Sequence, residues 1–212
     1  GRMSFFARFA QNRGALVGLI ILLLIITMAI LAPLLFPESP WRMVQRPFLP
    51  PLSQDGFPLG TDTMGRNVAS GLMHGAWVSL LIGLVSTSVA LLIGVPLGAI
   101  AGYYGGIIDD VLMRFTEFFQ TIPNFALAIV LVAIMQPSIT SIVLAIAIVS
   151  WPPVARLVRA EFMSLRNREY VEAARLVGQS NTTIILRQIL PNTLSPIIVL
   201  ASLMVATAIL LE

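Results

Sequence analysis

The side chains that could carry chemistry are few, and their types exclude most reactions. The chain has one histidine, His74, and no cysteine, and all 13 of its basic residues are arginine. A lone histidine without cysteine or clustered carboxylates is a poor metal site, so we expect His74 to have a structural role. Without lysine the chain can form neither a Walker-type phosphate loop nor a Schiff base. We therefore expect no catalytic, cofactor-binding or metal site, and expect any ATP to be hydrolysed elsewhere.

A charged stretch at 169–192, EYVEAARLVGQSNTTIILRQILPN, is the other place where side chains could act. Residues 169–177 are mostly good helix formers, and Gly178 stands where a helix C-cap is expected. The pattern predicts a short helix that ends at this glycine.

The composition of this short helix allows contact with a partner. Glu172 could pair with Arg168 or Arg175, one turn away on either side. Ala173 and Ala174 leave little side chain on one side, which allows another surface to approach closely. An ordinary solvated loop helix explains the same composition equally well.

The remainder of the chain is too apolar for a soluble domain, with 57% hydrophobic and 11% charged residues. A membrane span needs about 20 mainly apolar residues. Five candidate spans follow along the chain: ALVGLIILLLIITMAILAPLLF (15–36), WVSLLIGLVSTSVALLIGVPLGAIAGYY (77–104), IPNFALAIVLVAIM (122–135) extended backwards into RFTEFFQT (114–121), SITSIVLAIAIVSWPPVARLV (138–158) and ILPNTLSPIIVLASLMVATAILL (189–211). We expect an all-α, polytopic membrane protein. The sequence has no basic face interleaved with aromatic residues, so nothing suggests that the chain binds nucleic acid.

The third span has an amphipathic lead-in with helical charge spacing. Arg114 could pair with Asp110 or Glu117 on the same helix, and Pro123 is expected to kink or restart the helix. Asn124 and Ser150 could line a polar pathway, although hydroxyl and amide residues at such places also serve helix packing. Because ionisable residues are nearly absent from the spans, a secondary transporter or channel acting alone is the weaker alternative.

Arginine placement predicts the orientation. Ten of the 13 arginines fall on one side: Arg2, Arg8, Arg13, Arg114, Arg156, Arg159, Arg166, Arg168, Arg175 and Arg187. The loop at 37–76 holds only Arg42, Arg46 and Arg66. The positive-inside rule therefore places the N-terminus and the 169–192 stretch in the cytoplasm and the loop outside. Five spans that end at Glu212 suggest that a sixth span is missing.

Two motifs resemble a known family. Glu172-Ala173-Ala174, Gly178 and the apolar-Leu-Pro ending at Pro191 match in spacing the EAA loop of the membrane subunits of bacterial ATP-binding cassette importers, with Gln188 in place of the usual Ile. The block LGTDTMGRN at 59–67 resembles the L-G-T-D-x-x-G-R-D segment of C-type oligopeptide and dipeptide permeases, with Asn67 for Asp. The resemblance covers nearly the whole chain.

The resemblance implies a non-enzymatic permease subunit of six transmembrane helices in the bacterial inner membrane. Its partners would be membrane lipid, a homologous B-type permease, two cytoplasmic ATPases that bind ATP and Mg, and an external substrate-binding protein. Contact with the ATPases would be made by a cytoplasmic coupling helix in a loop at about 166–183, through Arg168, Glu169, Glu172, Ala173, Ala174, Arg175 and Gly178. Residues 1–76 would hold the tail, first span and external loop, and 77–212 the transporter domain. Peptides are the expected cargo, with nickel complexes or glutathione as alternatives.

Overall fold

The structure is a computed structural model that describes residues 13–211, and within them it contains helices and no β-strand. The helices are α2 (Arg13–Leu35), α3 (Val68–Tyr104), α4 (Gly106–Thr121), α5 (Asn124–Met135), α6 (Ile139–Leu165), α7 (Glu169–Leu176), α8 (Asn181–Thr183), a π-helix (Ile184–Ile189), a 3-10 helix (Leu190–Thr193) and α9 (Leu194–Leu211). The prediction of an all-α chain is confirmed. Arg2 and Arg8, used for the predicted orientation, and Glu212 lie outside the described residues.

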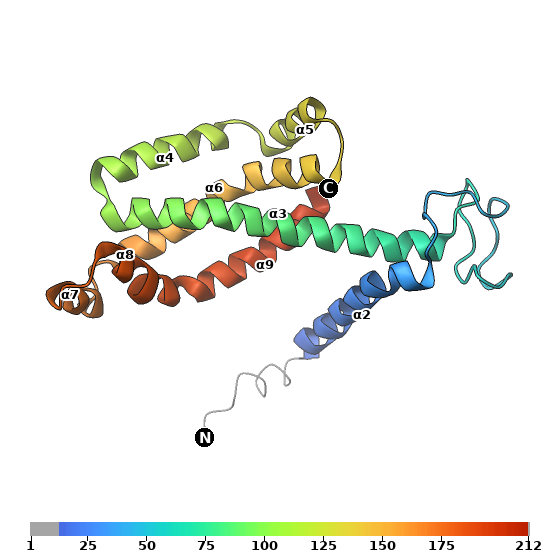
Figure 1. Cartoon of the computed structure of the whole chain (residues 1–212), viewed down its shortest axis with the longest axis horizontal. Helices are drawn as coiled ribbons and strands as arrows, with labels where there is room; N and C mark the ends of the chain where they lie inside the picture. Colours follow the sequence, from blue (N-terminus) through green and yellow to red (C-terminus); the bar gives the residue numbers. More distant parts are fainter. Residues whose placement is uncertain (1–12, 212) are drawn as a thin grey trace, which may run out of the picture. The chain divides into compact units, whose positions relative to one another are not determined.

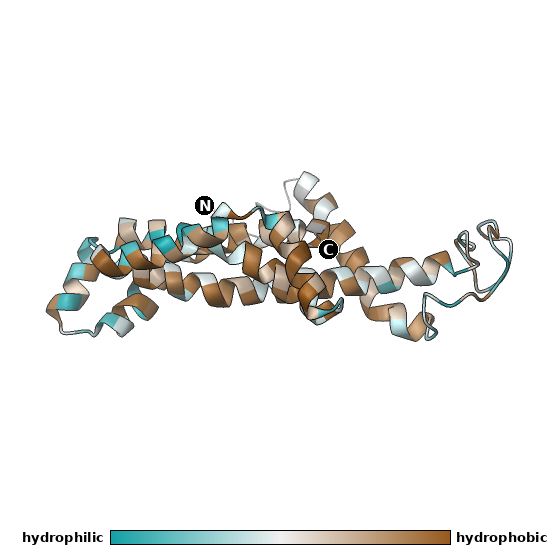
Figure 2. Cartoon of the chain, turned by 90° about the horizontal axis from the view of Figure 1, so that it is seen from above, coloured by the Kyte–Doolittle hydropathy of each residue, from teal (hydrophilic) through white to brown (hydrophobic). Residues whose placement is uncertain are grey.

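Four helical stretches of the described chain are long and apolar enough to cross a membrane: Leu16–Leu35, Val68–Tyr104, Ile139–Leu165 and Asn181–Leu210. Figure 2 colours most of their length as hydrophobic. If the bent pair of α4 and α5 forms one broken span, the number rises to five. The predicted apolar stretches are thus confirmed, but the third is divided.

The division lies at Pro123, where the axes of α4 and α5 meet at 83°. Ile122, the residue before the proline, is extended with φ −90° and ψ 132°. The proline ring disfavours a helical conformation at the preceding residue and removes one backbone donor. The expected restart at Pro123 is therefore confirmed: α4 runs back in the direction opposite to α3, and α5 then packs against α6 (Figure 1).

The chain divides into two compact units, Gly1–Leu81 and Ile82–Glu212, with the boundary inside α3. In the second unit, α3 packs on α6 through glycines four residues apart. A Cβ on Gly94 would lie 2.8 Å from the Trp151 carbonyl oxygen, and a Cβ on Gly98 or Gly102 would overlap a carbonyl oxygen of α6. Only glycine permits so close an approach, as in other small-residue packings of membrane helices.

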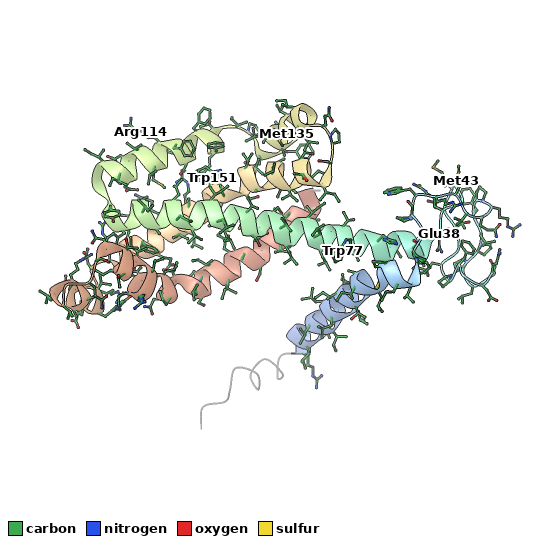
Figure 3. The ribbon with its side chains drawn as sticks, viewed as in Figure 1. Glu38, Met43, Trp77, Arg114, Met135 and Trp151 are labelled. Atoms are coloured by element: carbon green, nitrogen blue, oxygen red, sulfur yellow. The ribbon has the colours of Figure 1, made fainter. Side chains whose placement is uncertain are left out.

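Beside this contact lies the core of the second unit. The buried cluster contains Ala99, Tyr103, Val154, Val158, Phe162, Val171, Ala174, Ile184, Ile189 and Ile197. Aromatic side chains join α4 to α6. Trp151 of α6 stacks on Phe115 of α4 at 5.7 Å between ring centroids and meets Phe119 edge-on at 5.3 Å (Figure 3). The core therefore ties α3, α4, α6, α7 and the start of the last span together.

In the first unit, a loop at 36–67 connects α2 to α3 (Figure 1). His74 of α3 reaches the end of α2, with its Nε2 2.8 Å from the Phe36 carbonyl oxygen. Phe36 directly follows the last residue of α2, where backbone carbonyls have no partner within the helix. His74 therefore has the structural role that was predicted for it.

The LGTDTMGRN block forms the scaffold of this loop. Gly60 and Gly65 have φ of 75° and 76°, and a Cβ on either would overlap a backbone carbonyl oxygen, that of Leu49 or of Gln45. Thr61 Oγ1, in a buried residue, accepts from the Leu49 N–H at 2.8 Å and donates to the Arg46 carbonyl at 2.6 Å. Residues of the motif thus pack directly against the backbone of the 45–49 segment and hold it through hydrogen bonds.

The remaining motif residues close the turn and start α3. Asp62 Oδ1 accepts from the N–H groups of Met64 and Arg66, both at 2.9 Å, and the Arg66 side chain returns to Asp62 Oδ2 at 2.7 Å. Asn67 Oδ1 accepts from the N–H groups of Ala69 and Ser70. A side-chain oxygen at the residue before the helix is the preferred N-cap, which asparagine satisfies at this position as well as aspartate.

Candidate functional site

Helix α7 (Glu169–Leu176) lies at one end of the second unit, where hydrophilic residues gather (Figures 1 and 2). Its first turn carries Glu169 and Glu172 and its last turn Arg175, the arrangement that the helix dipole favours. Gly178 has φ 93°. Its N–H donates to the Arg175 carbonyl and the Gln179 N–H to that of Ala174, at 3.0 and 3.1 Å. This is a Schellman motif, so the predicted helix end is confirmed.

The inner face of α7 is packed against its own chain. Val171 is fully buried and Ala174 is 5% exposed, and both belong to the core cluster with Phe162, Ile184 and Ile189. The prediction that both alanines leave space for a partner is therefore wrong for Ala174, whose small side chain lets α7 approach α6 and the π-helix. Ala173 is exposed.

Polar contacts from the end of α3 secure the segment around α7. Tyr103 donates from its hydroxyl to Asn181 Oδ1 at 2.7 Å, and the Arg175 guanidinium lies 5.6 Å from the centre of the Tyr103 ring. Arg166, which follows α6, donates from Nη1 to the Gly102 carbonyl at 3.1 Å. These contacts make α7 an extension of the α3 and α6 pair.

The outer face of α7 is left open. Glu169, Glu172 and Ala173 are exposed, and the helix ends in Leu176 and Val177, with 89% and 80% of their surface exposed. Leu176 and Val177 were not among the residues predicted to make the contact. Two large apolar residues directly before the stop glycine, in a charged stretch, were the signal that could have found it.

The predicted ion pairs of Glu172 with Arg168 or Arg175 are not formed. Arg175 lies over the Tyr103 ring instead. Arg168 and Glu169 line a cavity of about 530 Å³ together with Leu165, Tyr170 and Asn192. The carboxylate of Glu172 is therefore available for contact outside the chain.

A second charged group joins α4 to α6. Arg159 makes a bidentate contact with Asp109 at 2.5 and 2.7 Å, and Arg156 lies 3.9 Å from Glu117 and donates to Gln120 at 2.5 Å. The predicted pairs of Arg114 with Asp110 and Glu117 within α4 are not formed, and Glu117 pairs with Arg156 of α6 instead. A shared cavity of about 370 Å³ is lined by Asp109, Asp110, Met113, Arg114, Glu117, Arg156 and Arg159.

The two predicted pathway residues lie apart from α7. Asn124 is exposed at the first position of α5, and Ser150 is half-buried on α6 beside Trp151. Ser86 and Ser88 of α3 donate to carbonyls of their own helix, those of Ile82 and Leu84. The residues predicted for coupling therefore lie together on and around α7, whereas Asn124 and Ser150 lie on α5 and α6.

Residues 94–212 match the family described as binding-protein-dependent transport system inner membrane component. The chain belongs to this family. Residues 3–51 match the N-terminal transmembrane domain of oligopeptide transport permease C. The resemblance to C-type permeases of ATP-binding cassette importers is thus confirmed, and the chain is a membrane transport subunit of bacterial inner-membrane type rather than an enzyme.

Curated relatives support the same assignment for this permease. It is 38% identical to the dipeptide transport system permease protein DppC of Haemophilus influenzae, over 98% of this chain and 72% of the relative. The di/tripeptide transport system permease protein DppC of Pseudomonas aeruginosa is 41% identical, over 98% and 70%. The oligopeptide transport system permease protein OppC of Escherichia coli is 37% identical, over 97% and 68%.

A solved structure shares the fold of the permease. The chain matches an inward-facing structure of the MetNI methionine ABC transporter with a TM-score of 0.57 and 21% identity, over 66% of this chain and 70% of that one. At this identity the likeness concerns the fold alone.

Proposed function

We propose that the chain carries di- and oligopeptides across the bacterial inner membrane together with a homologous B-type permease. The relatives that match it over nearly its whole length are named for dipeptide, di/tripeptide and oligopeptide transport. Nickel complexes and glutathione are the alternative cargoes. The external substrate-binding protein delivers the cargo, and two cytoplasmic ATPases bind ATP and Mg.

The single observation that carries the mechanism is the two-sided packing of α7. Its inner face, with Val171 and Ala174, is buried in the permease core, while Glu172, Ala173 and Leu176 are exposed. A helix that is packed on one side and open on the other suits a contact that must both bind a soluble motor and transmit force. We infer that the ATPase receives this outer face, with further contacts from Arg168, Glu169, Arg175 and the Gly178 turn.

Motion of α7 would pass into the membrane by two routes. Val171 and Ala174 pack on Phe162 of α6, and Arg166 follows this helix and is bonded to Gly102 of α3. Since α3 and α6 pack closely through glycine, a displacement of α7 would move both helices together. Asn124 and Ser150 would then line the pathway that these helices open.

The proposed orientation places α7 and the N-terminus in the cytoplasm and the 37–76 loop outside. It rests on the excess of arginine on the α7 side. Residues 1–76 would act as the external and anchoring part, and 77–212 as the transporter domain with its coupling loop at about 166–183.

The test is reconstitution of the chain with its B-type permease and ATPases in proteoliposomes. With the binding protein present, labelled di- and oligopeptides should enter the lumen only when ATP is supplied. Selective uptake of a nickel complex or glutathione would replace the peptide assignment. ATP-independent uptake by the chain alone would support the stand-alone transporter and contradict the proposal.

A further inference from the structure

Helix α4 carries an apolar and a charged stripe that lie next to each other. Ile107, Val111 and Phe118 share one face of the helix and are 80%, 59% and 62% exposed. Asp110 and Arg114 are exposed as well. Asp110 stands three positions from Ile107, and Arg114 stands three from Val111 and four from Phe118, so the two stripes are direct neighbours on the helix surface. A molecule that contacts this surface meets apolar and charged groups together.

The charged stripe lines the cavity of about 370 Å³ between α4 and α6, a volume within the usual range of small-molecule sites. Four of the charged side chains in this cavity are paired between the helices, as described above. Asp110 and Arg114 line the same cavity, and neither forms an ion pair or a hydrogen bond within residues 13–211. Figure 3 shows Arg114 on α4. One carboxylate and one guanidinium are therefore available to a ligand.

The charges of the cavity indicate a zwitterionic ligand. Three carboxylates and three guanidinium groups line it, so their formal charges cancel. A ligand with a single charge would be attracted by one of the two available groups and repelled by the other. A ligand that carries both charges would be attracted by Arg114 and by Asp110 at the same time.

The two available side chains also indicate which charged groups the ligand carries. A guanidinium binds phosphate through paired hydrogen bonds, and a carboxylate accepts hydrogen bonds from a primary ammonium, which has three N–H donors. A quaternary ammonium has no N–H group and is typically held by aromatic rings. No aromatic residue is among those that line this cavity. The cavity therefore favours a phosphate joined to a primary ammonium over a phosphate joined to choline.

The apolar stripe beside the cavity indicates that this ligand is a lipid. Helices α4 and α5 together have the length and hydropathy of a broken membrane span. The cavity lies toward the α7 end of the unit, because α4 begins directly after α3, whose Tyr103 bonds Asn181 beside α7. A headgroup near the end of a span, with acyl chains along the apolar side of the helix, is the arrangement of a phospholipid in one leaflet.

We propose that the cavity between α4 and α6 is a binding site for phosphatidylethanolamine. Its phosphate binds Arg114, its primary ammonium binds Asp110, and its acyl chains lie against Ile107, Val111 and Phe118. This site is separate from the outer face of α7, and the cargo of the permease plays no part in it.

The test measures lipid binding to the complete transporter by native mass spectrometry, after endogenous lipid has been removed in detergent. Phosphatidylethanolamine, phosphatidylcholine and phosphatidylglycerol with identical acyl chains are the probes, because they differ only in the headgroup. For the wild type we expect a Kd for phosphatidylethanolamine at least ~10-fold below that for either other lipid, as for one charge-assisted contact. Glycerophosphoethanolamine, which has the headgroup without acyl chains, should compete only at a concentration at least ~10-fold higher, because it buries no apolar area.

Variants of the two available side chains assign the groups. Arg114→Gln removes the phosphate partner and should raise the Kd for phosphatidylethanolamine by ~10-fold. Asp110→Asn removes the ammonium partner, so it should abolish the preference over phosphatidylcholine and strengthen the binding of phosphatidylglycerol. Arg187→Gln is the matched control, since Arg187 is an exposed arginine outside the cavity, and its Kd values should equal those of the wild type. Thermal unfolding without lipid should be unchanged in all three variants, which separates lost binding from lost folding.

Four results would overturn the lipid site. Equal Kd values for phosphatidylethanolamine and phosphatidylcholine in the wild type would show that Asp110 does not recognise the ammonium. Tightest binding of phosphatidylglycerol would assign the cavity to anionic lipid. Competition by glycerophosphoethanolamine at the same concentration as the lipid would make the ligand a soluble zwitterion. An unchanged Kd for phosphatidylethanolamine in Arg114→Gln would show that this lipid binds elsewhere on the transporter.

Discussion

Arg159 on α6 holds Asp109 on α4 through two hydrogen bonds, 2.5 Å from Nε to Oδ1 and 2.7 Å from Nη2 to Oδ2. Asp109 is 9% exposed, and paired bonds between a guanidinium and a carboxylate are among the strongest in proteins. One turn earlier on α6, Arg156 contacts Glu117 and Gln120 of α4. The helix that leads into α7 is therefore fastened to α4, although 50 residues separate the two partners.

Breaking this contact should destabilise the second unit. Asp109→Asn leaves the Arg159 charge partly buried without its carboxylate, so we expect the free energy of unfolding to fall by about 1.5 to 3 kcal/mol. Thermal unfolding in detergent measures the change, and a double-mutant cycle with Arg159→Gln isolates the pair. Glu117→Gln is the matched control: its pair with Arg156 is long and exposed, so the change should stay below about 1 kcal/mol. Equal effects at both sites would contradict the special role of Asp109.

The two neighbouring alanines of α7 should behave oppositely. Ala173→Trp adds bulk on the exposed face, so the chain should insert and fold while the ATPases no longer copurify. Ala174→Trp forces the same bulk into the core cluster, so the yield of folded chain itself should fall, since overpacking costs about 1 to 3 kcal/mol and occasionally more. Detergent-resistant yield and ATPase copurification distinguish the two results. Wild-type copurification in Ala173→Trp would remove the coupling role of the outer face.

The turn at Gly178 should accept asparagine but not valine. With φ 93° and no atom within 4 Å of a Cβ built there, the obstacle is backbone strain and not space. Gly178→Val should destabilise the turn by about 1 to 2 kcal/mol, and Gly178→Asn by less. Substrate-stimulated ATP hydrolysis, compared with hydrolysis in the absence of substrate, reports on the turn. Equal activity of the valine and asparagine variants would show that this turn does not position α7.

Asp62 should make the loop between α2 and α3 sensitive to acid. The backbone N–H of Arg66, followed by that of Met64 and by the Arg66 side chain, lowers the pKa of Asp62 below its ordinary value of 3.8. A carboxyl group whose pKa is lower in the folded state stabilises that state above the unfolded pKa, and this stabilisation disappears as the pH falls through the folded value. Amide exchange at Met64 and Arg66 should therefore lose protection only below pH 3.8. Asp62→Ala, which removes the acceptor oxygen, should lack this protection already at neutral pH, and a protected variant would contradict the assignment.

The orientation can be read with single cysteines, because the chain has none of its own. Ser53→Cys in the exposed loop should react with an impermeant maleimide from the external side. Asn167→Cys, exposed just before α7, should react only after the membrane is permeabilised. The reverse pattern would invert the topology and place α7 where no cytoplasmic ATPase could reach it.

Much of the fold could be predicted from local features. The apolar stretches, the restart at Pro123 and the end of α7 at Gly178 follow from length, composition and backbone chemistry within a few residues. These predictions succeeded because partition into lipid, the missing N–H of proline and the positive φ of glycine act without distant partners.

The errors share a different cause. Glu117 has acceptable partners both within α4 and on α6, and the sequence does not say which arginine reaches it. Glu117 pairs with Arg156 because α6 lies alongside α4, where Trp151 packs against Phe115 and Phe119. The positive φ of Phe48 and Leu52 was equally invisible, since it depends on hydrogen bonds that their N–H groups donate to the Asp62 and Pro58 carbonyls further along the chain.

The sequence by itself determined that the chain is a helical membrane permease with a short charged helix that stops at Gly178, because hydropathy, spacing and glycine placement are local properties. Only the tertiary structure decided that Ala174 faces inward and Ala173 outward. That choice depends on how closely α3 and α6 approach through Gly98 and Gly102, since this approach sets where the Phe162 surface lies against which α7 packs.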